Sequence, residues 1–386
     1  MDRKLKILLA REVERQKGTV NLIASENYAS ADVLALLGSP LANKYSEGYP
    51  GRRYYPGNAH CDKIESLARE YALRLFGLDP EKWRANVQPY SGSPANFAVY
   101  TALLEAGDTI MGFELSSGGH LTHGHKVSLS GKLFRAVQYG LNAKTSRIDY
   151  RDVARLAKKH RPKMIISGLT AYPRAIDFKK FGAIAKSVGA YHMADVSHIA
   201  GLIAAKLCQS PFPYADAVTT TTHKMLRGPR GAIIFSRAEI ADRVDRAVFP
   251  GLQGGPHNNA TAAIAQSLSE ALRPSYNRYA AQVLKNARAL AEEFVALGCA
   301  LVSGGTDNHL MLLDTVRSFG VDGLTAERLL EKNDITANRN SIPGDASPFK
   351  PSGVRLGTPA VTTRGMVEKD MRALARKIYA ILSRRG

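Results

Sequence analysis

Cysteine, tryptophan and long apolar runs are scarce in this chain of 386 residues, which has 3 cysteines and 1 tryptophan. Cys61, Cys208 and Cys299 are odd in number, far apart and outside any CxxC motif, which excludes a disulfide framework and a structural zinc site. No apolar run approaches the roughly 18 residues of a transmembrane helix. The first ten residues contain only a short apolar stretch, which does not suit a signal peptide. We therefore expect a cytoplasmic protein without disulfides or a membrane partner.

Acidic residues are also few. The chain has 34 Asp and Glu against 53 Lys and Arg, which gives a net charge of +19 and a pI near 9.8. Such a charge is typical of proteins that bind a polyanion, such as RNA, an anionic membrane or a polyglutamylated cofactor. However, the basic residues are spread along the chain, and no Lys/Arg block or RNA-recognition signature occurs. A diffusely basic surface is the favoured interpretation, and we expect no nucleic-acid partner.

Strand and helix patterns alternate through the middle of the chain. Short segments that suit strands occur at 85–88, 109–113, 163–167, 191–195, 217–221 and 232–235. Helical patterns separate several of these segments, which indicates an α/β fold with a mostly parallel sheet covered on both faces. In such sheets ligands bind at the carboxyl ends of the strands.

A smaller α/β domain is expected after this sheet. A long helical pattern at 260–298 is followed by strands expected at 300–302 and 309–313, and a last helix is expected at 365–383. We predict three parts, given by residue number: an arm that contacts a partner chain (1–58), a large domain (59–270) and a small domain (271–386).

One lysine stands where a predicted strand ends. The run from Thr219 to Gly231 is β-branched up to Thr222, continues with His223 and Lys224, and then breaks into a Gly/Pro turn. A lysine held in that position can form a Schiff base, although a solvated charge is the simpler interpretation. Asp195 ends an earlier predicted strand and could be only a helix cap. Together, a lysine and a carboxylate are what pyridoxal phosphate (PLP) chemistry requires of a protein.

Other motifs leave alternatives open. Ser91-Gly-Ser93 precedes a predicted helix and suits either a phosphate or a simple N-cap. His120 lies between glycines and could stack on a cofactor ring; its neighbours His123 and His125 lack a nearby carboxylate in the sequence, so we predict no metal site. Arg355, in a small and apolar segment, could bind a substrate carboxylate or form a structural ion pair. The tyrosine-rich segment 43–57 predicts an interface or a site.

Seven segments together resemble serine hydroxymethyltransferase. They are residues 21–27 (NLIASEN), 43–55, 118–124, 219–231, 249–256, 302–309 and 353–359. The resemblance extends from about residue 11 to 375. It implies a fold type I PLP enzyme with a mostly parallel seven-stranded sheet and a smaller C-terminal α/β domain. It also implies reversible transfer of the serine hydroxymethyl group to tetrahydrofolate, which yields glycine and 5,10-methylenetetrahydrofolate.

The resemblance assigns roles at the cofactor. Lys224 would form the Schiff base, and Asp195 would pair with the pyridine nitrogen. The ring would be contacted by His120, by His198 and by Thr170, which stands where the family usually has serine. The phosphate would be held by residues from both chains of a homodimer, or of a tetramer built from dimers: Ser91, Gly92, Ser93, Tyr45, Gly254 and Gly255.

The resemblance also assigns the substrate site. The serine carboxylate would be bound by Arg355 and Ser25, with His198 nearby. Glu47 would act as acid and base at the serine hydroxyl, and His223 would tune the lysine. Tyr55 would come from the partner chain. The positions that match folate contacts are Leu115, Gly119, Leu121 and Asn340.

The sequence also departs from the family in places. Met225 stands where threonine is usual, Ala232 replaces a usual glycine, and the sequence ends soon after the helix expected at 365–383. Three other functions stay open beside the one that the resemblance implies: a folate-independent aldolase of 3-hydroxy amino acids, an α-methylserine hydroxymethyltransferase, or, in another class, a basic RNA-binding protein. Glu47, Tyr55 and Asn340 argue against the folate-independent enzyme.

Overall fold

The computed structural model describes residues 1–345 and 350–384. The chain forms two compact units, which are Asn27–Ala281 and the combination of Met1–Glu26 with Gln282–Gly386. The division predicted from the sequence at residues 58/59 and 270/271 stays a prediction.

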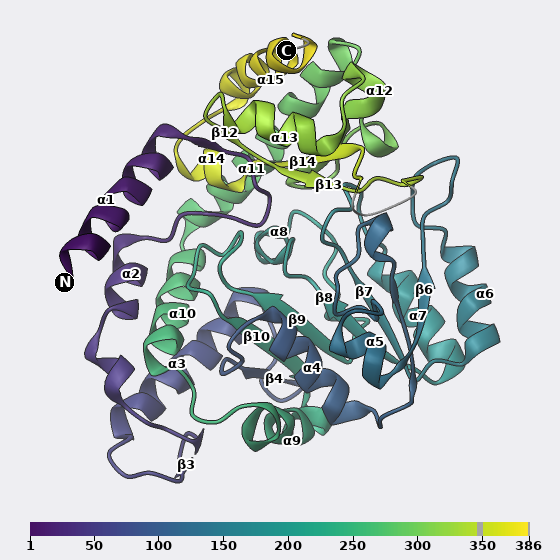
Figure 1. Cartoon of the computed structure of the whole chain (residues 1–386). Coiled ribbons are helices and arrows are strands. Elements are labelled where there is room, and N and C mark those ends of the chain that lie inside the picture. Colours follow the sequence, from purple (N-terminus) through teal and green to yellow (C-terminus); the bar gives the residue numbers. More distant parts are fainter. Residues whose placement is uncertain (346–349, 385–386) are drawn as a thin grey trace. The chain divides into compact units, whose positions relative to one another are not determined.

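A seven-stranded sheet forms the centre of the unit Asn27–Ala281, in the order β4-β10-β9-β8-β7-β5-β6 (Figure 1). Its strands are β4 (Trp83–Asn86), β5 (Thr109–Phe113), β6 (Arg135–Tyr139), β7 (Met164–Gly168), β8 (Tyr191–Asp195), β9 (Ala217–Thr221) and β10 (Ala232–Arg237). Only β10 runs against its neighbours, and all other pairings are parallel. The predicted mostly parallel sheet is confirmed.

Both faces of this sheet are buried. Ile110, Met164 and Met193 belong to a core cluster with α4 (Gly92–Leu103), and the alternate residues Met111 and Ile165 are also fully buried. Helices α6 (Tyr150–His160) and α7 (Phe178–Val188) pack together along β6, β7 and β8, whereas α4 and α9 (Ala238–Arg246) pack against β10. Burial on both faces explains why the central strands lack the regular alternation of apolar and charged residues that a half-exposed sheet shows.

Short elements and connecting helices complete this unit. They are α2 (Ala31–Leu37), η1 (Pro40–Asn43), β2 (Gly48–Tyr49), β3 (Arg52–Arg53), α3 (Ala59–Phe76), η2 (Leu115–Ser117), α5 (Leu129–Leu133), α8 (Ala200–Ala204), η3 (Ala247–Leu252), α10 (Asn258–Ala271) and the start of α11 (Pro274–Ala296). Sequence signals set several helix ends. The carboxylates of Asp149 and Asp177 accept hydrogen bonds from backbone N–H groups at the starts of α6 and α7, and Gly189 ends α7 with a φ of 69°.

The second unit has its own small sheets. Strands β11 (Leu310–Asp314), β14 (Gly353–Gly357) and β13 (Asn338–Asn340) pair in that order, and β1 (Val20–Asn21) pairs with β12 (Ile335–Thr336). The other elements are α1 (Arg3–Gly18), the end of α11, η4 (Val302–Gly304), α12 (Thr315–Phe319), α13 (Gly323–Glu331), α14 (Pro359–Thr363) and α15 (Glu368–Ser383). Its core joins Phe294, Leu330, Val354 and Ile378. This is the α/β character that the sequence predicted.

Local corrections have physical reasons. The helix expected at 260–298 is two helices, because Pro274 starts a new one as its first residue. Residues 300–302 form no strand; only an isolated bridge joins Leu301 to Leu313. Strands β6 and β14 had not been predicted, since β6 mixes polar and apolar residues and β14 begins and ends with glycine.

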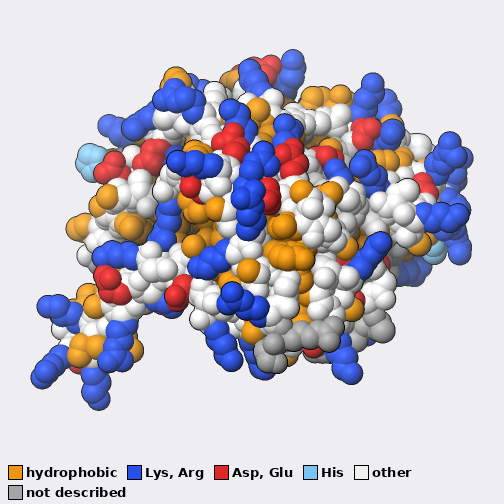
Figure 2. All heavy atoms as spheres, turned by 90° about the horizontal axis from the view of Figure 1, so that it is seen from above, with side chains coloured by type: hydrophobic (Ala, Val, Ile, Leu, Met, Phe, Trp, Pro, Cys, Tyr) orange, Lys and Arg blue, Asp and Glu red, His pale blue; other side chains and the backbone are white. Residues whose placement is uncertain are grey.

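On the face shown in Figure 2 the basic side chains are distributed rather than gathered. Figure 2 shows Lys and Arg across the whole visible face, with acidic groups between them.

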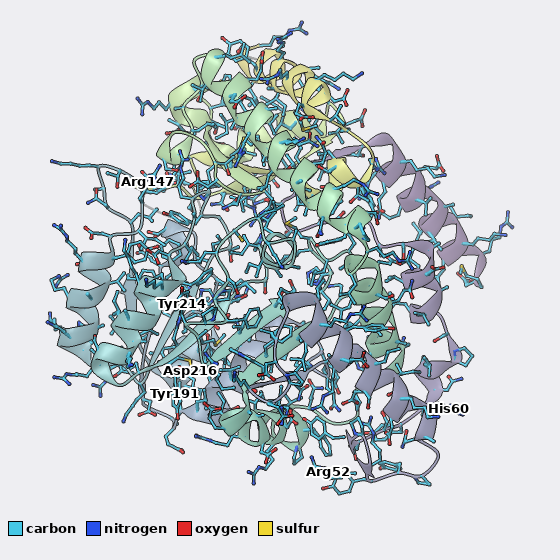
Figure 3. All side chains as sticks on the ribbon, turned by 180° about the vertical axis from the view of Figure 1, so that it is seen from behind. Arg52, His60, Arg147, Tyr191, Tyr214 and Asp216 are labelled. Carbon is cyan, nitrogen blue, oxygen red and sulfur yellow. The ribbon has the colours of Figure 1, made fainter. Side chains whose placement is uncertain are left out.

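Among residues 1–345 and 350–384, every helix is too short or too polar to cross a membrane. The three cysteines are free thiols. Figure 3 labels Tyr191, the first residue of β8, and Asp216, which directly precedes β9 and accepts the His192 N–H at 2.7 Å.

Candidate active site

The carboxyl ends of three adjacent parallel strands carry the central residues of the candidate site. Asp195 is the last residue of β8, Thr170 follows β7, and Lys224 follows β9. The order β9-β8-β7 makes the three strand ends neighbours in space (Figure 1). Parallel pairing therefore brings together residues from three separate segments of the sequence.

Asp195 is held as a buried carboxylate. Its Oδ2 accepts a hydrogen bond from Asn96 Nδ2 at 2.9 Å and lies 3.2 Å from His123 Nε2, and its Oδ1 accepts one from the Ser197 N–H at 3.1 Å. Burial alone would raise the pKa of Asp195, but the His123 hydrogen bond and the nearby charges, including Lys224, lower it well below its usual value. The group is thus suited to face a cation.

Two histidines flank this carboxylate. His120 Nδ1 lies 2.8 Å from Thr122 Oγ1, and burial lowers the pKa of His120 to about 4, so its ring is neutral at physiological pH. The ligand atoms of His120, His123 and Asp195 lie within 4.8 Å of one another. Within this group of three, His123 Nε2 and Asp195 Oδ2 form a hydrogen bond with each other. The absence of a metal site stays a prediction.

Lys224 and His223 are half-buried between the buried residues Thr222 and Met225. Burial and the charge of Lys224 lower the pKa of His223 to about 3. Within the described part of the chain, His223 Nδ1 is a buried atom without a hydrogen-bond partner. Met225, at the position where the sequence departs from its resemblance, is 1% exposed and belongs to the core. His198 is 1% exposed as well.

The N-terminus of α4 is the candidate phosphate site predicted from the sequence. The Ser91 side chain makes no capping hydrogen bond to the described residues, so hydroxyl and backbone N–H groups there can face a ligand. A Cβ at Gly92 would lie 2.8 Å from Cγ2 of Thr221, so the loop approaches β9 too closely for a larger residue. The predicted segment Ser91-Gly-Ser93 therefore starts a helix beside the lysine strand.

A second group of predicted residues lies on the arm. The Tyr45 hydroxyl donates to Glu47 Oε1 at 3.2 Å, and the rings of Tyr45 and Tyr55 meet edge to face at 5.0 Å. A Cβ at Gly254 would lie 3.2 Å from Glu47 Oε1, and one at Gly255 would lie 3.4 Å from the Tyr45 ring. The structure thus brings all five residues together. Tyr45 and Tyr55 are 53% and 45% exposed.

A buried ion network fixes this arm. Arg53 Nε and Nη2 contact Asp62 at 2.8 Å and Glu65 at 2.7 Å, and Arg53 Nη1 donates to the carbonyls of Ser46 and Gly48. The Arg53 side chain is 4% exposed and that of Glu65 is 3% exposed. Because Ser46 and Gly48 flank Glu47 in sequence, the network sets the backbone from which Glu47 projects.

Arg355 lies in the other unit, on β14. Its Nε donates to Asn338 Oδ1 at 3.2 Å, and its Nη2 donates to Ser25 Oγ at 3.5 Å. Burial lowers the pKa of Arg355 to about 10. Arg355 and Ser25, predicted to bind one carboxylate, thus lie together.

The predicted folate positions lie on two segments. Leu115 is in η2, and Gly119 and Leu121 follow it; a Cβ at Gly119 would lie 2.0 Å from the Phe113 carbonyl oxygen. The Gly118 carbonyl just before them accepts a hydrogen bond from the Thr170 N–H at 2.8 Å. Asn340 belongs to β13 of the other unit. Their roles stay predictions.

The family model of serine hydroxymethyltransferase matches residues 1–378. The chain belongs to the serine hydroxymethyltransferase family. It is 55% identical to serine hydroxymethyltransferase 1 of Pseudomonas aeruginosa over 378 residues, which cover 97% of this chain and 89% of that protein. It is 54% identical to serine hydroxymethyltransferase of Acidothermus cellulolyticus over 369 residues, or 95% of this chain and 85% of that protein. Membership confirms the fold type I class expected from the sequence.

The sequence analysis did not identify the residues that hydrogen-bond Asp195 and its partner Asn96. Asn96 and His123 bind Asp195, and Thr219 Oγ1 donates to Asn96 Oδ1 at 2.7 Å. The pair of His120 and His123 was visible as a histidine cluster, but the carboxylate partner lies 72 residues away from His123. Asn96 carried no signal beyond its place in a helix otherwise rich in apolar residues.

Proposed function

We propose that this serine hydroxymethyltransferase family member transfers the hydroxymethyl group of serine to tetrahydrofolate, giving glycine and 5,10-methylenetetrahydrofolate, with PLP as its cofactor. One observation carries the proposal beyond family membership: Asp195 ends β8 as a buried carboxylate, Lys224 follows the adjacent strand β9, and the charge of Lys224 helps to lower the pKa of Asp195. An amine for a Schiff base and a carboxylate for a ring nitrogen are the pair that PLP enzymes require.

The residues present fit PLP. Lys224 would bind its aldehyde carbon, and Asp195 would hold a protonated pyridine nitrogen. The N–H groups at the start of α4, with Ser91 and Ser93, would bind the phosphate. His120, neutral because of burial, can lie against the ring without placing a charge there. When bound, PLP draws electron density from the substrate and stabilises negative charge at its α-carbon.

Other residues of the chain would orient the substrate and move its protons. Arg355 and Ser25 would bind the serine carboxylate and so fix which bond at the α-carbon breaks. Glu47 would accept the proton of the serine hydroxyl as the carbon–carbon bond breaks. His223, kept neutral by burial and by the charge of Lys224, would add no competing cation beside the lysine. Leu115, Gly119, Leu121 and Asn340 would contact the folate.

A homodimer with shared sites is part of the proposal. Tyr45 and Tyr55 are half-exposed, although they belong to an ordered cluster with Glu47. On α1, Leu5, Leu8 and Leu9 are 61%, 59% and 53% exposed. Exposed apolar side chains at helical spacing favour burial by a second protein surface. The partners would then be a second copy of the chain, serine or glycine, and tetrahydrofolate, in the cytoplasm.

The folate-dependent and folate-independent reactions can be separated with one variant. Glu47→Gln keeps the shape of Glu47 but removes its proton-accepting charge. We expect it to slow folate-dependent serine cleavage at least 100-fold, and to slow the aldol cleavage of a 3-hydroxy amino acid far less. Glu14→Gln, at an exposed ion pair with Lys17 on α1, is the matched control. Equal losses in both reactions would favour the aldolase alternative.

A further inference from the structure

The backbone turn that follows Lys224 is closed by two hydrogen bonds to one carbonyl. The Lys224 carbonyl oxygen accepts the N–H of Arg227 at 3.1 Å and Nδ2 of Asn27 at 3.0 Å. Arg227 has a φ of 55°, which keeps the turn tight. The Lys224 side chain starts from the residue whose carbonyl accepts these two bonds, so the turn fixes the backbone from which this side chain projects.

Asn27 uses its whole amide in this arrangement. Its Nδ2 also donates to the Tyr279 hydroxyl at 2.7 Å, and its Oδ1 accepts the N–H of Tyr28 at 2.9 Å. The guanidinium carbon of Arg227 lies 4.5 Å from the centre of the Tyr279 ring. One asparagine and one tyrosine therefore contact both ends of the lysine turn.

A second tyrosine of α11 extends the contact. The Tyr276 hydroxyl donates to the Met225 carbonyl at 3.0 Å, and Arg227 lies 5.7 Å from its ring. Tyr276 is 1% exposed. The first turn of α11 thus holds the backbone on the C-terminal side of the lysine.

Both places where the chain passes between the two units are next to this cluster. The passages are at Glu26/Asn27 and at Ala281/Gln282. Asn27 stands at the first passage, and Tyr279 precedes the second by two residues. Ser25, two residues before Asn27, accepts the hydrogen bond of Arg355. Three consecutive residues therefore connect the Arg355 contact to the Lys224 contact.

We propose that Asn27 and Tyr279 are positioning residues that fix the Lys224 turn and couple it to the segment that would bind the substrate carboxylate. The coupling rests on the proposed roles of Arg355 and Lys224. A carboxylate that binds Arg355 and the Ser25 hydroxyl would restrain residue 25. The short connection would pass that restraint to the Asn27 amide and so to the Lys224 carbonyl. A purely structural role would cost stability without a specific effect on the turn.

The positioning is tested in the protein without PLP, by hydrogen exchange of the backbone amides of residues 224–228. Asn27→Ala and Tyr279→Phe should speed this exchange at least tenfold. Asn27→Asp should speed it as much as Asn27→Ala or more, because it places a carboxylate oxygen against a carbonyl. Tyr139→Phe is the control, since the buried Tyr139 hydroxyl donates to the Ile166 carbonyl at 2.9 Å and should leave residues 224–228 unchanged. If hydrogen exchange at residues 224–228 is equally fast in Asn27→Ala and Tyr139→Phe, the proposed positioning role of Asn27 is wrong.

The coupling is tested in the PLP-loaded protein with acetate, a carboxylate without an amine, against chloride at equal ionic strength. Acetate should protect residues 353–357 and change exchange at 224–228 at least threefold. In Asn27→Ala the protection at 353–357 should remain, and the change at 224–228 should be lost. The same change in both proteins, or no acetate effect at either segment, would overturn the coupling. Failure to bind PLP would refute the proposed function, while the test without PLP would still decide the positioning.

Discussion

Replacing Arg53 with methionine tests how the arm is held. Arg53 and Glu65 are 4% and 3% exposed and meet at 2.7 Å. Removing one partner of a buried ion pair leaves the other charge uncompensated, which costs about 3–5 kcal/mol. The substitution also removes the hydrogen bonds to Asp62, Ser46 and Gly48. We therefore expect Arg53→Met to lower the free energy of unfolding by about 3–5 kcal/mol near pH 8.

The loss should depend on pH. Burial raises the pKa of Glu65, and the charge of Arg53 opposes that shift. Without Arg53, the pKa of Glu65 in the folded protein rises further above its unfolded value. The protonated form then fits the folded state, so the penalty is absent at low pH and appears as pH rises through the folded pKa. The deficit relative to the unaltered protein should be smaller at pH 5.5 than at pH 8 by about 1 kcal/mol or more.

Urea unfolding followed by circular dichroism at both pH values measures this deficit. Arg155→Met is the control, because the Arg155 side chain is 63% exposed in its pair with Asp152 and should change stability by only about 0–1 kcal/mol. A loss below about 1 kcal/mol for Arg53→Met, or an equal loss at both pH values, would refute the reasoning.

Three further predictions concern the candidate site and its support. Lys224→Ala should abolish turnover and the absorbance of protein-bound PLP while keeping the circular dichroism spectrum; an unchanged rate would contradict the role of Lys224. Gly92→Ala should weaken PLP binding at least tenfold in a titration, because its Cβ would meet Thr221, whereas Gly18→Ala, with nothing within 4 Å, should not. His192 is fully buried with its pKa lowered to about 4 from 6.5. Between these two pKa values His192 is protonated in the unfolded chain but neutral in the folded protein. The free energy of unfolding should therefore fall by up to about 3 kcal/mol as the pH is lowered from 6.5 to 4. His192→Gln should reduce that slope, as measured by urea unfolding across this range.

The sequence best predicted the strands that are buried on both faces. Strands β7, β8 and β9 are buried on both faces and consist mostly of apolar and β-branched residues, and Asp195 and Lys224 stood out at or just after the ends of those runs. By contrast, Arg355 was noticed as a lone arginine, but its strand β14 was not, because glycine at both ends hides the pattern.

Contacts across long separations could not be predicted from local pattern. Asn27 and the Lys224 carbonyl are 197 residues apart, and Glu65 and Gln88 are 23 apart. Each of these polar residues alone is typical of a loop or a helix surface. Only the folded backbone shows that they satisfy buried partners, which is why the support of the site was missed although the ends of its strands were found.

The central claim is that Lys224 and Asp195 serve PLP chemistry coupled to folate. The most direct test is the absorption spectrum of the PLP-loaded protein in glycine, recorded before and after tetrahydrofolate is added. The account predicts a long-wavelength band that grows with tetrahydrofolate and is absent from Lys224→Ala. A spectrum without protein-bound PLP, or a band that does not respond to tetrahydrofolate, would contradict it.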